Sequence, residues 1–242
     1  MPDEDNGVVL SIVIPTLDAA AHLPGCLEAL EAGRRTARDL AVVPPDIELV
    51  VVDGGSADDT VAIAGRVGAR VIAAPRGRGA QLAAGARAAN GDWLLFLHAD
   101  TRLAQGWLAA VAGFVNNPAN PARAAAFRFA LDDAGRAARL IEAAVAWRCR
   151  SLALPYGDQG LLISRAFYGE LGGYGPEPLM EDVALVRRIG AGRLRMLEVA
   201  AVTSAERYRR GGWLLRPLRN LSCLGLYLLG LPTPVIRRLY GR

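Results

Sequence analysis

The sequence has three cysteines and no cysteine cluster. Cys26, Cys149 and Cys223 lie far apart, with no Cys-x-x-Cys pair and no Cys/His grouping. This spacing excludes a disulfide framework and a structural zinc site, and it is typical of a protein from a reducing compartment. We therefore predict a cytoplasmic protein.

A signal peptide and a membrane-spanning run are also missing. The first residues, MPDEDNGVVLSIVIPT, are acidic where a secretory signal is basic, and they lack a cleavage site, so we expect a first strand there. The longest apolar stretch, residues 221–236, is interrupted by Pro232 and Pro234 and is too short to span a bilayer. We predict no transmembrane helix.

Lysine is absent, and all 28 cationic residues are arginine, a bias that we attribute to genomic base composition. The net charge of +4 is unevenly distributed, because residues 187–242 hold twelve arginines against Glu198 and Glu206 alone. A basic tail of this kind is typical of contact with nucleic acid, phosphate-bearing ligands or an anionic membrane. Few aromatic residues accompany the basic loops, so we predict no nucleic-acid partner.

The chain is long and apolar enough for a sizeable core. Of its 242 residues, 52% are hydrophobic and 21% are charged, which is typical of a globular protein. In the first hundred residues, continuous apolar runs alternate with helical spacing. This alternation predicts an α/β fold with a mostly parallel sheet and helices on both faces. We expect strands at 8–15, 47–52, 71–74 and 93–97, helices at 19–32, 58–67 and 80–89, and a surface loop at 34–45.

The second half of the chain is less regular. There we expect strands at 122–131, 160–164 and 194–199, and helices at 135–150, at 181–189 and from about residue 213. No internal repeat or low-complexity linker divides the sequence. We predict one domain over residues 1–242, made of a nucleotide-binding half (8–101), an acceptor and catalytic half (102–205) and a basic, amphipathic C-terminal helical segment (206–242).

Polar residues collect where the predicted strands end, which is where open α/β sheets bind their ligands. Together they suit a nucleotide diphosphate with a divalent metal, since carboxylates bind ribose, base or metal while arginines and loop amides bind phosphate. The first strand leads to Pro15, Thr16 and Asp18, the second to Asp53 and Gly54, the third to Arg76 and Gly79, and the fourth to His98 and Asp100.

Each of these residues also has a purely structural interpretation. Asp53 before Gly-Gly-Ser can shape a turn and cap a helix, and the Arg-Gly-Arg-Gly run that starts at Arg76 can be a solvated loop. That run lacks the third glycine of a nicotinamide-binding fingerprint. His98 can be a hydrogen-bonded core histidine, and Glu181 and Asp182 can be ordinary acids at a helix N-terminus. The four loops taken together are harder to explain as structure alone.

The sequence resembles a family-2 glycosyltransferase of the GT-A (nucleotide-diphospho-sugar transferase, Rossmann-like) fold over roughly residues 8–200. Four segments carry the resemblance by their order and spacing: SIVIPTLDAAAHLPGCLEAL, ELVVVDGGSADDT, PRGRGAQLAAGARAANGDWLLFLHADT and LGGYGPEPLMEDVALVRRI. The compact size, the HADT form and the GDQG segment are similar to a small bacterial subgroup. That subgroup is called selenodomain-associated transferase 2, or arsenosugar-biosynthesis glycosyltransferase.

The resemblance implies a role for each matched residue. Pro15, Thr16 and Asp18 match the loop at the base and ribose, Asp53 the acid that contacts the base, and Arg76 and Gly79 the loop near the diphosphate. Asp100 matches the second acid of the metal-binding Asp-x-Asp motif, and Asp182, with Glu181 beside it, matches the catalytic base. Gly157, Asp158 and Gln159 are expected to border the acceptor pocket.

The sequence departs from the family pattern at one key position. His98 stands where the first acid of the Asp-x-Asp motif is expected, so it either joins Asp100 as a ligand of Mn²⁺ or Mg²⁺ or hydrogen-bonds the ribose. The Gln-x-x-Arg-Trp motif of processive synthases is absent. The resemblance therefore implies a hexosyltransferase-type enzyme that transfers one sugar, with inversion, from a nucleotide-diphosphate sugar, UDP-sugars favoured.

Several alternatives stay open at this stage. A non-catalytic nucleotide-sugar-binding or scaffold protein is one, and a nucleotidyltransferase is another. The second would carry a Gly-rich basic loop after the first strand, where this chain has PTLDAAAHLPG. The acceptor is unidentified, with a lipid-linked one included. The Arg- and Leu-rich C-terminal segment either makes a peripheral membrane contact or packs on the core or on a second subunit of a homodimer.

Overall fold

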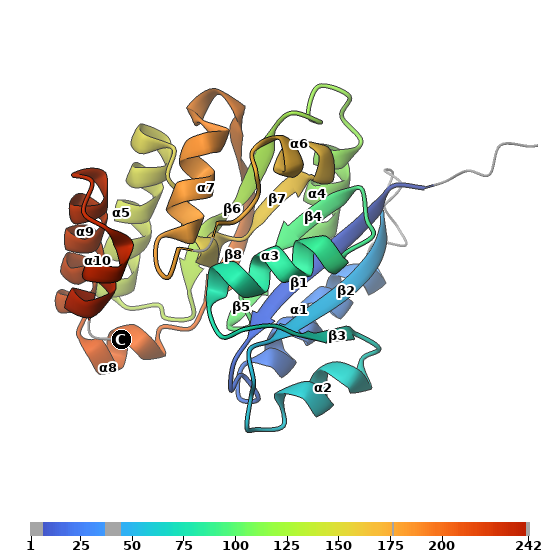
Figure 1. The fold of residues 1–242 in the computed structure, drawn as a ribbon, viewed down its shortest axis with the longest axis horizontal. Coiled ribbons are helices and arrows are strands. Elements are labelled where there is room, and N and C mark those ends of the chain that lie inside the picture. The colour runs from blue at the N-terminus through green and yellow to red at the C-terminus, as the bar shows by residue number, and fades with distance from the viewer. Residues whose placement is uncertain (1–6, 37–44, 176, 241–242) are drawn as a thin grey trace, which may run out of the picture.

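The computed structural model describes residues 7–36, 45–175 and 177–240. Their strands form one sheet in the order β3-β2-β1-β4-β7-β6-β8-β5 (Figure 1). The pairs β3–β2, β2–β1, β1–β4 and β6–β8 are parallel, whereas β4–β7, β7–β6 and β8–β5 are antiparallel. The strands are β1 (Val9–Thr16), β2 (Asp46–Asp53), β3 (Arg70–Ala73), β4 (Trp93–Phe96), β5 (Thr101–Leu103), β6 (Ala124–Leu131), β7 (Leu161–Ser164) and β8 (Leu194–Thr203).

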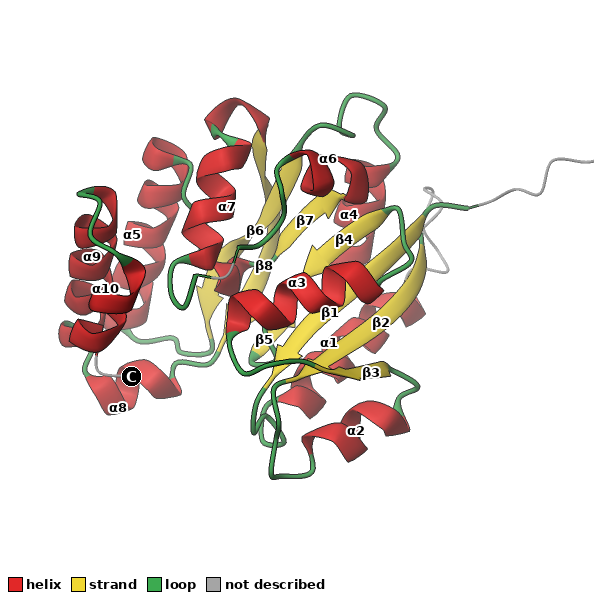
Figure 2. Ribbon diagram, in the orientation of Figure 1, coloured by secondary structure: helices red, strands yellow, loops and turns green. Residues whose placement is uncertain are grey.

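Helices cover both faces of this sheet, with α3, α6 and α7 in front and α1 and α4 behind (Figure 2). α8, α9 and α10 follow the last strand at one side of the molecule (Figure 1). The helices are α1 (Leu23–Thr36), α2 (Thr60–Arg66), α3 (Arg78–Ala88), α4 (Trp107–Val115), α5 (Arg136–Leu152), α6 (Arg165–Glu170), α7 (Glu181–Ile189), α8 (Glu206–Gly211), α9 (Leu215–Leu228) and α10 (Thr233–Tyr240).

The continuous apolar runs of the central strands follow from this two-sided cover. In β4, Leu95 packs into the cluster beneath α1 and α4, while Leu94 and Phe96 pack into the cluster beneath α3, α6 and α7. Successive side chains of a strand point to opposite faces. A strand that is buried on both faces therefore needs apolar residues at every position.

Strand register brings the carboxyl ends of the parallel strands to one edge. Thr16 at the end of β1 pairs with Asp53 at the end of β2, and Asp53 pairs with Ala73 at the end of β3. Beyond β4, the Leu97 amide donates to the carbonyl of Val13 in β1 (3.0 Å). The loops that follow these strands therefore open at the same edge of the sheet.

The α/β class, the mostly parallel sheet and the helical cover agree with the sequence prediction. The three cysteines are buried and free, as expected for a protein without disulfides. No helix within the described ranges is long and apolar enough to cross a bilayer. The predicted loop at 34–45 is partly wrong, because 34–36 continue α1, and its residues 37–44 lie outside the described part, as do residues 1–6.

Three elements were not predicted, and one prediction was too simple. β5, α4 and α6 are absent from the expected set, and the single C-terminal helix from about residue 213 is instead α9 and α10, with α8 before them. Gly212 and Gly230 adopt positive φ values of 83° and 86°, and each follows the end of a helix. Glycine tolerates this left-handed backbone, which ends a helix, so the C-terminal segment folds as short helices.

Candidate functional site

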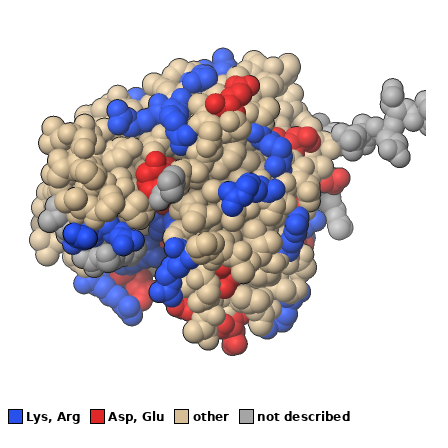
Figure 3. Space-filling view, viewed as in Figure 1, with Lys and Arg blue, Asp and Glu red and all other residues tan. Residues whose placement is uncertain are grey.

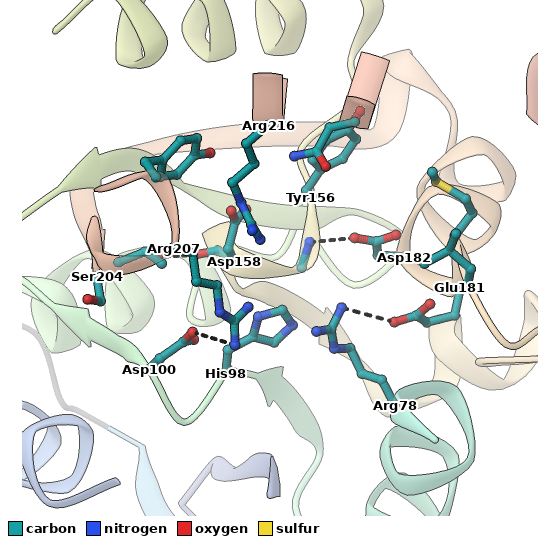
Figure 4. A pocket seen from close by; sticks show the side chains of 16 residues that line it. Arg78, His98, Asp100, Tyr156, Asp158, Glu181, Asp182, Ser204, Arg207 and Arg216 are labelled. Carbon is teal, nitrogen blue, oxygen red and sulfur yellow. Dashed lines mark hydrogen bonds and ion pairs between the residues drawn. The ribbon is translucent and has the colours of Figure 1, made fainter. Parts of the chain in front are cut away.

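Two helices begin at the same edge where the parallel strands end. α3 starts at Arg78 and α7 starts at Glu181, so both helix N-termini border the loops after β1 and β4. Two adjoining cavities occupy this place, and Figure 4 shows the side chains around the smaller one.

The larger cavity, here the donor-side cavity, has a volume of about 400 Å³. Its walls come from the loops after β1, β3 and β4. Of the residues predicted to bind the nucleotide sugar or metal, six line it: Pro15, Thr16, Asp18, Arg76, His98 and Asp100. Its floor is fixed by the buried Gln81, whose Nε2 donates to the carbonyls of Thr16 (2.7 Å) and Val52 (2.9 Å). One side chain thus ties the ends of β1 and β2 together.

The smaller cavity, here the acceptor-side cavity, has a volume of about 150 Å³. Tyr156, Gly157, Asp158 and Asp182 line it, and α8 and α9 close it with the residues Tyr208, Arg216 and Asn220. Both cavities share a wall that is formed by Arg78, His98, Asp100, Leu179, Glu181 and Arg207. A molecule in one cavity therefore lies next to a molecule in the other.

Two adjacent carboxylates open α7 and face different partners. The Asp182 Oδ2 accepts a hydrogen bond from the Gly157 amide (2.8 Å), which directs this carboxylate toward the acceptor-side cavity. Glu181 is only 3% exposed and pairs with Arg78 across 3.5 Å. Burial, and then the neighbouring charge of Asp182, raise the pKa of Glu181 to about 7. The helix N-terminus favours negative charge at both positions.

The turn after β4 brings His98 and Asp100 into both cavities. Burial and the nearby charge of Arg78 lower the pKa of His98 to about 3, so its imidazole is neutral at pH 7. Burial opposes ionisation of Asp100, but the guanidinium charges of Arg207 and Arg78 favour it, and the pKa of Asp100 is lowered. The Asp100 Oδ2 lies 3.3 Å from an Arg207 guanidinium nitrogen. A neutral imidazole and an ionised carboxylate thus stand two residues apart.

Asp158 has an oxygen atom without a partner. Its Oδ1 is shielded from solvent and accepts no hydrogen bond from the residues that the structure describes. Burial and the charges of Asp182 and Asp100 raise the pKa of Asp158 to about 6, although Arg148 opposes this shift. An unpartnered buried carboxyl is costly, and it is the kind of group that a bound hydroxyl would satisfy.

Four of the predicted site residues lie away from both cavity walls. The Asp53 Oδ2 accepts from the amides of Gly55 and Ser56 (both 2.9 Å), and its Oδ1 accepts from the Ser56 hydroxyl. Gly54 packs on Gln81. Asp53 is therefore engaged in the turn after β2, as the structural interpretation expects, and its contact with a nucleotide base stays a prediction.

The other two of these residues, Gly79 and Gln159, also have structural roles. A Cβ at Gly79 would lie 2.8 Å from the Gly175 carbonyl oxygen, so this glycine allows α3 to approach the segment before α7. Gln159 is 1% exposed, donates to the Phe127 carbonyl (2.9 Å) and accepts from the Tyr156 amide (3.3 Å). It shapes the turn that holds Gly157 and Asp158 and does not border the acceptor-side cavity.

The family model described as Glycosyl transferase family 2 matches residues 11–148, which is more than half of the chain. The chain belongs to glycosyl transferase family 2. Membership of this family favours a glycosyltransferase over a non-catalytic scaffold and over a nucleotidyltransferase.

Relatives of this glycosyltransferase occur among mycobacterial proteins. A PGL/p-HBAD biosynthesis glycosyltransferase of Mycobacterium bovis is 41% identical over 115 residues, which cover 44% of this chain and 41% of that protein. An uncharacterized glycosyltransferase of Mycobacterium tuberculosis is 34% identical over 101 residues, which cover 41% of this chain and 40% of that protein. The chain thus spans about two fifths of the length of the curated relatives that it matches.

Solved structures share the fold of this glycosyltransferase. Glucosyl-3-phosphoglycerate synthase from Mycobacterium tuberculosis, crystallised with Mn²⁺, UDP and phosphoglyceric acid, matches with a TM-score of 0.60 and 20% identity, covering 93% of this chain and 80% of that one. Staphylococcus aureus TarS matches with a TM-score of 0.59 and 15% identity, covering 82% of this chain and 61% of that one. The architecture is therefore GT-A, as the sequence resemblance implied.

The wall that both cavities share offers few ligands for a divalent metal. The described residues contain no group of three or more His, Cys, Asp and Glu side chains that could hold a metal ion. His98 and Asp100 remain as a pair of nitrogen and oxygen donors at the wall that both cavities share. Mg²⁺ in proteins is commonly held by one or two carboxylates together with substrate phosphates and water. Asp100 fits an ion that binds together with a diphosphate, and the neutral His98 beside it can add a nitrogen ligand.

The sequence did not single out several residues that surround these cavities. Arg207 and Arg216 belong to the arginine-rich tail, which by composition indicates only a basic surface. Tyr156 directly precedes the GDQG segment and Gln81 lies within the third quoted segment, but neither carries a pattern of its own. Arg78, by contrast, was expected to assist Arg76 at the diphosphate from the Arg-Gly-Arg-Gly loop; it is the first residue of α3 and pairs with Glu181.

Proposed function

We propose that this glycosyltransferase moves a single sugar from a UDP-sugar to an acceptor hydroxyl, with inversion at the anomeric carbon. The observation that carries the proposal is the pair of cavities that meet at the wall of Arg78, His98, Asp100 and Arg207. Direct displacement needs donor and acceptor side by side in fixed orientation, and adjoining cavities provide for this.

The donor-side cavity suits the nucleotide diphosphate. Its volume of about 400 Å³ lies within the range of small-molecule sites, and it contains the loops that match the nucleotide-binding motifs of the family. Arg76 and Arg78 bring positive charge to the position of the phosphates. The preference for uridine is supported by two proteins of the same fold, which were crystallised with UDP and with UDP-GlcNAc.

Asp182 is the proposed general base. Its Oδ2 accepts from the Gly157 amide and its Oδ1 from the Val183 amide (2.7 Å), and each oxygen keeps a second lone pair for an incoming hydroxyl. The acceptor proton passes to this carboxylate while the acceptor oxygen bonds to the anomeric carbon. The unpartnered Oδ1 of Asp158 is proposed to accept a second hydroxyl of the acceptor and so to orient it.

The leaving group is proposed to depart toward the arginines. The bond between the anomeric carbon and the phosphate oxygen breaks, and the nucleoside diphosphate takes the electron pair. Arg78 and Arg207 lie at the wall between the cavities and stabilise the charge that develops there. A divalent ion, Mn²⁺ or Mg²⁺, would be held by Asp100 and His98 and would supply Lewis-acid stabilisation of the diphosphate.

The substitution Asp182→Asn tests this assignment. It should abolish release of UDP from a panel of UDP-sugars with acceptor extracts, because the amide cannot take the proton. It should leave UDP binding intact, because Asp182 lines only the acceptor-side cavity of the two. UDP release gives the first readout, and the rise in melting temperature with UDP and Mn²⁺ gives the second.

Asp59→Asn is the matched control. Asp59 precedes α2 and makes no side-chain capping bond, so this variant should behave as the wild type in both assays. Undiminished turnover of the Asp182→Asn variant would show that another group is the base. Stabilisation by GDP- or dTDP-sugars in place of UDP-sugars would overturn the preference for uridine.

A further inference from the structure

One face of α9 consists of leucines that nothing in the described structure covers. Leu218 and Leu221, in the middle of this face, are 58% and 62% exposed. Helical spacing aligns them with further exposed leucines at both ends of the helix. We call this set the leucine face: Leu214, Leu215, Leu218, Leu221, Leu228 and Leu229.

The opposite face of α9 is the one that packs on the protein. Cys223 and Leu224 are buried, and Tyr227 packs against the core beneath α3 and α7. Arg216 and Asn220, which lie on this side, line the acceptor-side cavity. The helix therefore satisfies its contacts to the fold with one face and still presents an apolar face outward. A contiguous exposed apolar face of this kind marks an interaction surface.

The charged residues of α9 and α10 have one sign. Residues 212–240 contain four arginines and neither Asp nor Glu, whereas the arginines of α8 pair with Asp100, Asp133 and Glu206. Figure 3 shows the side of the molecule over α9 and α10 as mostly uncharged surface, with basic side chains and some acidic ones along its lower border. A second copy of the chain would bring the same positive charge against this face, whereas an anionic surface would be attracted to it.

The length of α9 fits a helix that lies on a bilayer. Its 14 residues extend about 21 Å, which is shorter than the hydrocarbon core of about 30 Å. Helices with an apolar face and arginines beside it lie in the plane of the lipid headgroups, with the apolar side chains below them. Anionic lipids add an attraction for the arginines that salt weakens.

We propose that the leucine face of α9 docks the protein on an anionic lipid bilayer. Docking places the acceptor-side cavity about one helix diameter, roughly 10 Å, from the lipid surface, because Arg216 and Asn220 of the same helix line that cavity. This last step rests on the proposed function, since it assigns an acceptor to the cavity. The docking itself depends only on α9 and its charge.

Vesicle sedimentation of the full chain tests the docking. The protein should sediment with phosphatidylglycerol–phosphatidylcholine vesicles, bind pure phosphatidylcholine more weakly, and lose binding in about 0.5 M NaCl. The double variant Leu218→Ser/Leu221→Ser should bind the anionic vesicles at least about tenfold more weakly, because two apolar side chains no longer enter the lipid. The single variant Leu229→Ser should show a smaller loss in the same direction.

Val61→Ser/Val67→Ser is the matched control. It removes two exposed apolar side chains at α2, which lies beside β3 at the opposite end of the molecule from α9 (Figure 1), and should leave vesicle binding unchanged. Stabilisation by UDP is measured for every variant. A variant that has lost its fold shows no stabilisation by UDP while the wild type does, and a failure of the proposed donor shows as absent stabilisation in the wild type as well. Both are thereby distinguished from a loss of docking. Equal binding by wild type and the double variant would overturn the proposal. The proposal would also be overturned if the wild type formed a concentration-dependent dimer that the double variant abolishes, and did not bind vesicles.

Discussion

Gly157 is the position where one added methyl group should separate activity from stability most clearly. Its amide donates to the Asp182 Oδ2, and a Cβ on it would lie 2.8 Å from the His98 Nε2 and 3.4 Å from that same Oδ2. The backbone of Gly157 is not in the left-handed region, so alanine brings no backbone strain there. The substitution Gly157→Ala therefore acts through the contact with His98.

The size of the effect follows from that contact. The distance between the added Cβ and the His98 Nε2, 2.8 Å, must increase by about 0.6 Å to reach the 3.4 Å of an ordinary contact. Either His98 moves, or the turn of Gly157 moves and carries its amide away from Asp182. Displacements approaching 1 Å at a reacting centre cost about 10²-fold in rate. Crowding of this kind lowers the free energy of unfolding by about 1–3 kcal/mol.

The assay compares two glycine-to-alanine variants. Gly157→Ala should lower kcat for UDP release by about 10²-fold while urea unfolding shows the modest loss of stability. The control Gly113→Ala lies in α4, where a Cβ meets nothing within 4 Å, and should raise the free energy of unfolding by about 0.5–1 kcal/mol without changing kcat. Wild-type kcat in the Gly157→Ala variant would refute the assigned proximity of His98, Gly157 and Asp182.

Three further outcomes follow from the contacts of the site. Asp158→Asn should raise the free energy of unfolding at pH 8 by up to about 3 kcal/mol and change it little at pH 4. In the wild type the folded-state pKa of Asp158 is about 6 against an ordinary 3.8, so the free energy of unfolding falls as the pH rises through about 6. Urea unfolding in which the substitution has the same effect at pH 8 and pH 4 would contradict this. Arg207→Gln should lower the Mn²⁺ concentration for half-maximal stabilisation, measured at saturating UDP so that weaker UDP binding does not contribute, because the guanidinium no longer competes for Asp100. It should change stability by less than about 1 kcal/mol, because the Arg207 side chain is half exposed. A rise in that Mn²⁺ concentration would count against metal binding at Asp100. Gln81→Ala should cost about 1–3 kcal/mol in urea unfolding, because two buried hydrogen bonds between the ends of β1 and β2 are lost, although the Thr16 carbonyl keeps the Gly54 amide and the Val52 carbonyl keeps the Thr16 hydroxyl. An unchanged midpoint would show that water replaces the lost donor.

The fold was predictable where the sequence has a clear period. The strands of the first half are continuous apolar runs because both faces of the sheet are covered, and the helices between them carry one apolar stripe. α4 was missed because its sequence, WLAAVAGFV, is apolar almost all round and so has no helical stripe. β5 has three residues, too few to show any alternation.

The candidate site was predictable in part. The rule that ligands bind beyond the carboxyl ends of strands selected Thr16, His98 and Asp100, and these line the donor-side cavity. The same rule selected Asp53, whose oxygens are engaged by the turn that follows it. Local sequence does not distinguish a carboxylate that faces a cavity from one that is satisfied by its own loop, because both stand before a turn.

The sequence by itself determined the α/β class, the resemblance to family 2 and the edge of the sheet where the chemistry collects. Only the tertiary structure decided which groups meet there, since Asp100 and Arg207 are brought together by the packing of α8 near the turn after β4. The tertiary structure also decided which face of α9 points outward. A helical period tells which residues share a face, but whether that face is covered depends on what packs against it. In α9 the core covers Cys223 and Leu224 and leaves the leucine face outside.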